Sequence, residues 1–228
     1  MSNKIDEKKK LERVEYMAEQ GCQFRHFASF EIREAKDAPE GDPDLIVRGL
    51  AVPFNSTTVL FSYDGIDYKE VIDARAFDEA DMSDVIFNYN HGGKVVARTR
   101  NNTLELTVDN SGLHMSARLG GTEEGKRLYE EIKGGYIDRM SFAFTVSESS
   151  YNIDTHTRTI LKVRKVYDVS AVDIPAYDTT SISARNSFAV EIESEKKAAA
   201  EAAAISLRKE VLQTEIQQTI NIMEENQK

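Results

Sequence analysis

The chain has 228 residues, of which 40% are hydrophobic and 30% charged, and its formal net charge is −10. These values are typical of a soluble globular protein with one medium-sized domain and appendages, and they argue against a disordered chain. The negative charge disfavours nucleic acid as a partner, and no run of roughly 20 apolar residues predicts a membrane span.

Cysteine and histidine usage limits the chemistry further. The single cysteine, Cys22, excludes an internal disulfide framework and a multi-thiolate metal site. We interpret it as a free thiol rather than a nucleophile. The histidines lack the close helical spacing of a zinc site, so we expect no metal and no other cofactor. The first residues lack the apolar stretch of a secretory signal, which favours a cytosolic protein.

Residues 1–22 form the first segment of the chain. Charges of both signs alternate there, and Leu11, Val14 and Met17 recur at helical spacing. This pattern predicts a short, weakly held amphipathic arm, in which we expect no catalytic group.

Residues 23–187 differ from this arm in composition and in sequence pattern. Short runs rich in Val, Ile, Phe, Tyr and Thr are broken by Gly, Asn, Asp and Pro, which predicts a β-rich domain. Within it, hydrophobic residues alternate on both sides of the turn at 109–112, which predicts a hairpin over 101–119. The next segment, 122–137, has acids in its first turn and Gly134-Gly135 as a stop signal, which predicts an inserted helix.

Two long strands are predicted after this helix. In RMSFAFTV, Met140, Phe142 and Phe144 alternate with polar or small residues, so Ser141 opens a strand and faces away from the aromatic side chains. A polar stretch joins this strand to a second extended run, which Pro175 ends. We expect the two strands to pair.

Residues 188–228 predict a helical tail. Good helix formers fill the segment, and Leu212, Ile216, Ile220 and Met223 follow one another at three- to four-residue spacing. Such an apolar stripe has to be covered. A partner helix or self-association would cover it, and so would folding back onto the β-domain.

Three polar residues of the β-domain suit acyl transfer: His91 in NYNHGGK, Ser141, and Asp168 in VYDVSAVDIPAY. A serine hydroxyl is a poor nucleophile until an imidazole removes its proton, and a carboxylate can fix the imidazole tautomer. Each residue also has an ordinary interpretation, as a turn histidine, a strand-edge serine and a solvated strand charge. The glycines beside them, Gly92, Gly93, Gly134 and Gly135, fit turns and helix caps as well as an oxyanion site.

Several segments in a fixed order connect these residues to a known family. They are GLAVPFN (49–55), EVIDARAF (70–77), the His91 segment, NNTLELTVDNSGL, KGGYIDRMSFAF and DVSAVDIPAYDTTSISAR. Together they cover most of residues 45–185, and the chain resembles the caudovirus prohead proteases, which mature the heads of tailed phages.

This resemblance implies a fold and an activity. It implies a β-rich α+β fold with a β-barrel similar to that of the herpesvirus assemblins. It also implies a serine endopeptidase with His91 and Ser141 as catalytic residues. The third member matches Asp168, while Asp173, His114 and His156 remain alternatives.

The resemblance also implies a setting. The enzyme would work inside the immature prohead in the host cytoplasm, where it would cleave the scaffold segment of the major capsid protein and then itself. One rival interpretation is a non-catalytic head-assembly or scaffolding protein with the same fold. Another is a small esterase, although no Gly-x-Ser-x-Gly elbow surrounds Ser141.

Overall fold

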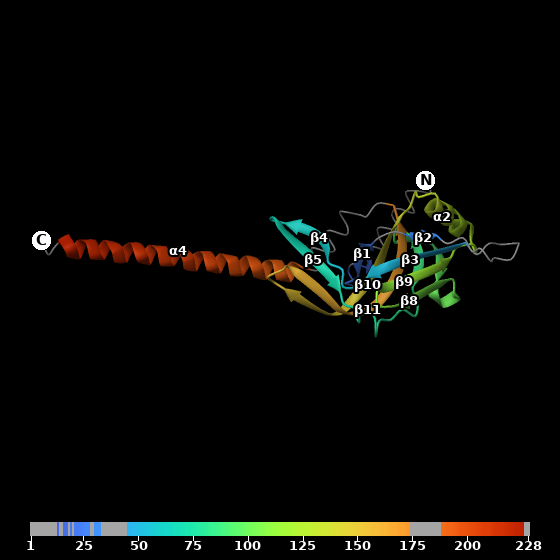
Figure 1. Cartoon of the computed structure of the whole chain (residues 1–228), viewed down its shortest axis with the longest axis horizontal. Coiled ribbons are helices and arrows are strands. Elements are labelled where there is room, and N and C mark those ends of the chain that lie inside the picture. The colour runs from blue at the N-terminus through green and yellow to red at the C-terminus, as the bar shows by residue number, and fades with distance from the viewer. Residues whose placement is uncertain are drawn as a thin grey trace. The chain divides into compact units, whose positions relative to one another are not determined.

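The structure is a computed structural model that describes residues 13, 16, 17, 19, 21–27, 30–32, 45–173 and 188–225. Its contacts divide the chain into two compact units, with the division between residues 186 and 187. Figure 1 shows the elements of both units.

Two β-sheets make up most of the first unit. The larger sheet has seven strands in the order β1-β10-β11-β5-β4, with β6 also paired to β11 and β7 paired to β6. Its strands are β1 (Gln23–Phe27), β4 (Thr58–Tyr63), β5 (Ile66–Ile72), β6 (Ile86–Tyr89), β7 (Gly92–Arg98), β10 (Arg139–Asn152) and β11 (Thr157–Val172). The smaller sheet has the order β2-β3-β9-β8. Its strands are β2 (Phe30–Ile32), β3 (Ile46–Pro53), β8 (Leu104–Val108) and β9 (Gly112–Arg118).

The predicted β-rich α+β class is confirmed, whereas the closed barrel is not. The larger sheet is mixed, because β11 is antiparallel to β10 but parallel to both β5 and β6. Among the described strands, β1, β4 and β7 each pair on one side only, so this sheet has open edges. The described strands therefore form two sheets without a closed barrel.

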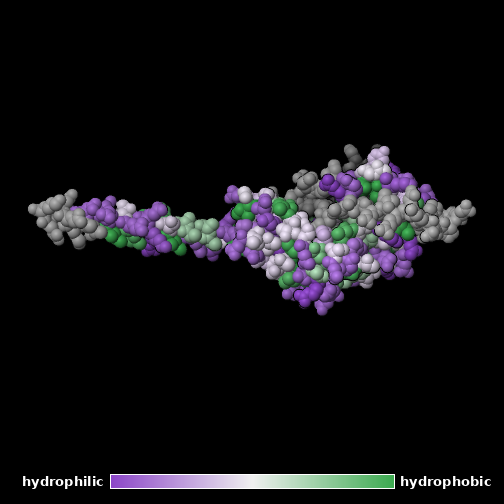
Figure 2. All heavy atoms as spheres, viewed as in Figure 1, coloured by the Kyte–Doolittle hydropathy of each residue, from purple (hydrophilic) through white to green (hydrophobic). Residues whose placement is uncertain are grey.

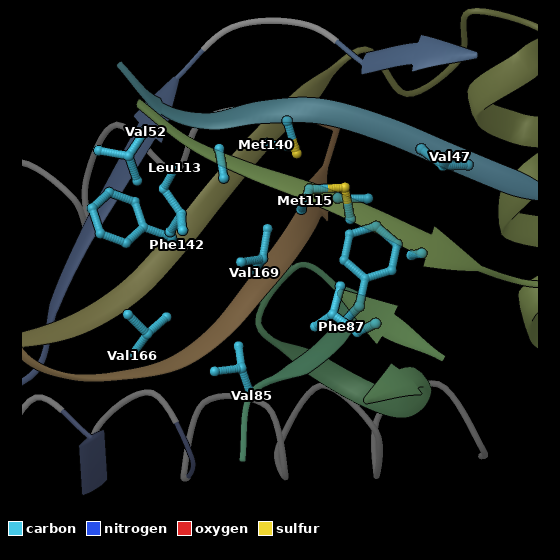
Figure 3. Close-up of a cluster of buried hydrophobic side chains, with 14 of the residues drawn as sticks. Val47, Val52, Val85, Phe87, Leu113, Met115, Met140, Phe142, Val166 and Val169 are labelled. Atoms are coloured by element: carbon cyan, nitrogen blue, oxygen red, sulfur yellow. The ribbon is translucent and has the colours of Figure 1, made fainter. Parts of the chain in front are cut away.

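The main core lies between the two sheets (Figure 3). The smaller sheet contributes Val47, Leu113 and Met115, and the larger sheet contributes Phe87, Phe142 and Val169. Side chains alternate between the two faces of a strand. Burying Phe142 in this core therefore turns the neighbouring Ser141 toward the opposite face of the larger sheet, where the candidate site lies.

The predicted pairings within the β-domain are confirmed. Strands β8 and β9 form the hairpin, and β10 pairs with β11 in antiparallel register. A short 3-10 helix, Thr99–Asn101, precedes β8. Helix α2 (Glu123–Lys133) begins after Thr122, whose side-chain oxygen accepts a hydrogen bond from the Gly125 N–H. The helix ends at Lys133, directly before the predicted stop signal Gly134-Gly135.

The second unit contains helix α4 (Ala189–Glu225), which confirms the predicted tail helix. Leu212 and Ile216 are exposed on it, and hydrophobic residues gather along one edge of the helix in Figure 2. Ile220 and Met223 lie outside the described side chains, and what covers the stripe stays a prediction. No helix in the described part of the chain is both long and apolar enough to span a membrane.

Candidate active site

Ser141 lies near the start of β10, between two neighbouring strands. On one side Ser170 of β11 is its register partner, and on the other side the backbone of His26 in β1 lies opposite. The Ser141 side chain is 0% exposed. Both edges of β10 are therefore occupied at the level of the candidate nucleophile.

His91 lies in the tight turn that joins β6 to β7. Tyr89 and Gly92 are cross-strand partners, and the two residues between them, Asn90 and His91, have φ values of 51° and 56°. Positive φ at both central positions is what a type I′ hairpin turn requires. Positive φ is uncommon for residues other than glycine, and such backbone conformations cluster at functional sites. The turn interpretation of His91 is thus correct, and the same turn aims its ring at Ser141.

The structure brings the three predicted residues together on one face of the larger sheet. His91 Nε2 lies 2.6 Å from Ser141 Oγ, and His91 Nδ1 lies 2.7 Å from Asp168 Oδ1. With its proton on Nδ1, the ring donates to Asp168 and accepts the Ser141 hydroxyl proton at Nε2. This is the arrangement of nucleophile, base and orienting carboxylate that acyl transfer to a serine needs.

The Asp168 carboxylate is fully buried, and polar neighbours surround it. Its Oδ1 also lies 3.0 Å from Ser170 Oγ, and its Oδ2 accepts a hydrogen bond from Arg13 at 3.3 Å. Burying a carboxylate costs free energy unless hydrogen-bond donors and positive charges compensate for its lost hydration. Arg13 and Ser170 supply that compensation beside His91.

The alternative third members lie elsewhere. Asp173 accepts hydrogen bonds from the Tyr89 hydroxyl at 2.5 Å and the Asn90 amide at 3.0 Å, so it braces the turn that carries His91. Burial and this carboxylate raise the pKa of Tyr89 to about 12. His114 contacts Ser111, and His156 contacts Tyr151.

Two of the glycines considered for an oxyanion site have other roles. The Gly134 N–H donates to the Glu130 carbonyl, and the Gly135 N–H donates to the Ile132 carbonyl. Both donors therefore complete the end of α2 and are not free to bind an oxyanion in this conformation.

The N-terminal arm is less peripheral than its sequence suggests. Phe24 of β1 packs edge-on against the His91 ring, with 4.8 Å between the ring centroids. Met17 and Cys22 are buried with Phe24 against Ala143. Met17 and Cys22 of the predicted arm are therefore packed against the β-domain, and the absence of a catalytic group from the arm stays a prediction. Leu11 and Val14 lie outside the described residues.

Cys22 is buried close to the site but is unsuited to be its nucleophile. Burial, and secondarily the negative charge of Asp168, raise the pKa of the Cys22 thiol well above its usual range. The reactive form of cysteine is the thiolate, so this environment makes the thiol inert.

Sequence reasoning missed several residues of the site: Arg13, Phe24, Asn88 and Ser170. Arg13 lies in the N-terminal arm and Phe24 in β1, and both are near the site because β1 pairs with β10. Ser170 could have been found, because it lies two residues after Asp168 in a strand and so shares its face.

Known proteins resemble this chain in sequence and in structure. Residues 29–195 match the family of caudovirus prohead serine proteases. Among solved structures, the capsid assembly protease of bacteriophage T4 matches with 12% sequence identity and a TM-score of 0.43, over 68% of this chain and 99% of that chain. No curated protein sequence gave a match. The family match covers well over half of the chain, and the protein therefore belongs to the caudovirus prohead serine protease family.

Proposed function

We propose that this protein is a serine endopeptidase in which Ser141 is the nucleophile, His91 the general base and Asp168 the residue that orients His91. The observation that carries the proposal is the continuous hydrogen-bonded chain from Ser141 Oγ through the His91 ring to Asp168. The three residues come from different strands and turns, and only a folded sheet unites them.

The chemistry follows from this chain of contacts. Ser141 Oγ bonds to the peptide carbonyl carbon while its proton moves to His91 Nε2, and Asp168 stabilises the imidazolium that forms. The C–N bond then breaks, and the imidazolium gives its proton to the leaving amine. Water, deprotonated by His91, attacks the acyl-enzyme, and Ser141 recovers its proton as the acid product leaves.

Substrate entry requires a movement. Ser141 is buried, and β1 and β11 occupy both edges of its strand. A peptide carbonyl can reach Oγ only after a covering segment shifts. An extended peptide that pairs with an exposed strand edge is the kind of substrate this β-structure would accept.

We infer the biological substrate from the family. The scaffold segment of the major capsid protein, and the protease itself, are the chains that a maturation enzyme would cleave inside the immature prohead in the host cytoplasm. Helix α4 would bring the enzyme there by pairing its stripe with scaffold helices or with a second copy. Deleting residues 193–228 should then prevent packaging while peptide cleavage continues. Packaging of the truncated enzyme at the normal level would refute this role of the helix.

The catalytic proposal is tested by co-expressing the protein with the phage major capsid protein. Intact-mass spectrometry should show that the wild type trims the capsid protein and itself, and that Ser141→Ala and His91→Ala do not. Ser147→Ala is the matched control, because Ser147 lies on the same strand but is exposed and bonds only a backbone carbonyl. Trimming by Ser141→Ala at the wild-type rate would refute the proposed role of Ser141 as the nucleophile. A wild type that never trims would favour a non-catalytic assembly role.

A further inference from the structure

Ser170 stands out as a buried hydroxyl that contacts both partners of the histidine–carboxylate pair. Its Oγ lies 3.0 Å from Asp168 Oδ1, 3.2 Å from His91 Nδ1 and 3.3 Å from the His91 backbone nitrogen. It also lies 2.5 Å from Oδ1 of Asn88. Ser170 and Asn88 are both 0% exposed. We propose that Ser170, supported by Asn88, is a positioning residue that holds His91 and Asp168 in the reactive arrangement. This inference rests on the proposed catalytic roles.

The sheet register explains why these groups meet. Asn88 of β6, Ser170 of β11 and Ser141 of β10 are partners across three adjacent strands. Paired positions on neighbouring strands share a face. The three side chains therefore form a polar row beneath the His91 turn, on the face opposite the hydrophobic core.

The number of protons available shows which groups of this row donate hydrogen bonds and which accept them. A hydroxyl has one proton to donate and two lone pairs to accept with. The His91 backbone N–H uses one lone pair of Ser170. Among the described residues, Asn88 Nδ2 has no hydrogen-bond partner, although its amide oxygen lies against Ser170. A half-turn of this amide lets Nδ2–H donate to the second lone pair of Ser170, which frees the hydroxyl proton for Asp168.

The resulting series of hydrogen bonds leads from Asn88 to the His91–Asp168 pair. Asn88 donates to Ser170, Ser170 donates to Asp168 Oδ1, and the same oxygen accepts the His91 Nδ1 proton. Holding that proton on Nδ1 leaves Nε2 free to accept the proton of Ser141. The bond from the His91 N–H to Ser170 also holds the backbone of a turn residue with positive φ. Ser170 thus fixes both the tautomer and the position of the base.

The test uses full-length protein and purified capsid protein as the substrate. Ser170→Ala should lower kcat by about 10- to 100-fold, the usual effect of losing a hydrogen bond to a charged group, and leave KM nearly unchanged. It should also slow the labelling of Ser141 by a serine-directed phosphonate by a similar factor, because labelling needs an activated hydroxyl but no peptide binding. If Ser170 had a purely structural role, Ser170→Ala would lower the melting temperature without this selective loss of kcat and of labelling rate.

Two further variants make the test specific. Thr145→Val is the matched control, because Thr145 is a buried residue of β10 whose hydroxyl has no partner among the described residues. We expect wild-type kinetics for it. Asn88→Ala should lose less activity than Ser170→Ala. The double variant should be no worse than Ser170→Ala alone, since both residues act along one chain.

The outcomes separate this inference from the proposed function. If Ser141→Ala is inactive but Ser170→Ala has wild-type kcat and labelling rate, the positioning role is refuted and the catalytic triad stands. Additive losses in the double variant would refute the coupling of Asn88 to Ser170. If Ser141→Ala still cleaves the capsid protein, the proposed function itself fails.

Discussion

Arg25 of β1 and Glu70 of β5 form a buried ion pair across the larger sheet. Arg25 Nε lies 2.5 Å from Glu70 Oε1, and the second guanidinium contact, Nη2 to Oε2, is 2.8 Å. Strands β10 and β11 lie between β1 and β5 in this sheet. The Arg25 guanidinium lies over the ring of Phe144 in β10. This pair ties the N-terminal strand, whose backbone lies opposite the candidate nucleophile, to the far part of the sheet.

Breaking this pair should strongly destabilise the protein. In Arg25→Met, the Glu70 carboxylate stays buried, and within the described residues Arg158, at the longer distance of 3.9 Å, is its remaining ion-pair partner. Removal of one partner of a buried pair typically lowers the free energy of unfolding by about 3–5 kcal/mol. Urea denaturation measures this loss. Lys94→Met is the control, because the Lys94–Glu124 pair is exposed to solvent and its loss should change the free energy of unfolding little. Equal stabilities of the two variants would contradict the stabilising role of the buried Arg25–Glu70 pair.

Asp168 and Asp173 should differ sharply in their effect on catalysis. Asp168→Asn removes the acceptor that holds the His91 proton on Nδ1, and loss of the correct tautomer lowers kcat by about 10⁴-fold in serine proteases. Asp173→Asn weakens contacts to Tyr89 and Asn90, which do not touch the His91 ring nitrogens, so we expect a loss below about 10-fold. Steady-state cleavage of the capsid protein distinguishes the two. A larger loss in Asp173→Asn would identify the wrong carboxylate as the partner of His91.

Cys22 should resist alkylation in the folded protein. Burial and the neighbouring Asp168 charge raise the pKa of its thiol, so little thiolate is present near neutral pH. Iodoacetamide at about pH 8 should modify the native protein at least ~100-fold more slowly than the denatured protein. Mass spectrometry over time follows the reaction. Rapid modification of the native protein would mean that the arm does not rest against the site in solution.

Gly125 should not tolerate alanine, although it lies in the first turn of α2. Alanine normally favours a helix by about 1 kcal/mol over glycine. Here a Cβ at Gly125 would collide with the backbone carbonyl oxygen of Leu119, which is not a flexible group. We expect Gly125→Ala to lower the free energy of unfolding by about 1–3 kcal/mol.

Gly121→Ala is the matched control for this substitution. Its Cβ would point into open space, so its stability should stay within about 0.5 kcal/mol of the wild type. Thermal denaturation of both variants provides the comparison. A stabilised Gly125→Ala protein would show that the approach of Leu119 to the helix is looser than described.

Much of the β-domain could be predicted because its signals are local. The hairpin of β8 and β9, the stop of α2 at Gly134 and the inward face of β10 each follow from residues within a few positions of one another. His91, Ser141 and Asp168 were recognisable as candidates from residue type and segment order. Their local surroundings alone were equally consistent with ordinary turn and strand roles.

What the chain itself specified was the periodicity of its strands and helices and the identity of three candidate catalytic side chains. Tertiary structure decided which residues surround them: Arg13 on the second oxygen of Asp168, Phe24 against His91, and the row from Asn88 through Ser170 to Ser141. These contacts depend on strand order and register, which long-range pairing sets and no local pattern contains. The two open sheets in place of a closed barrel have the same origin, since closure depends on how distant strands meet.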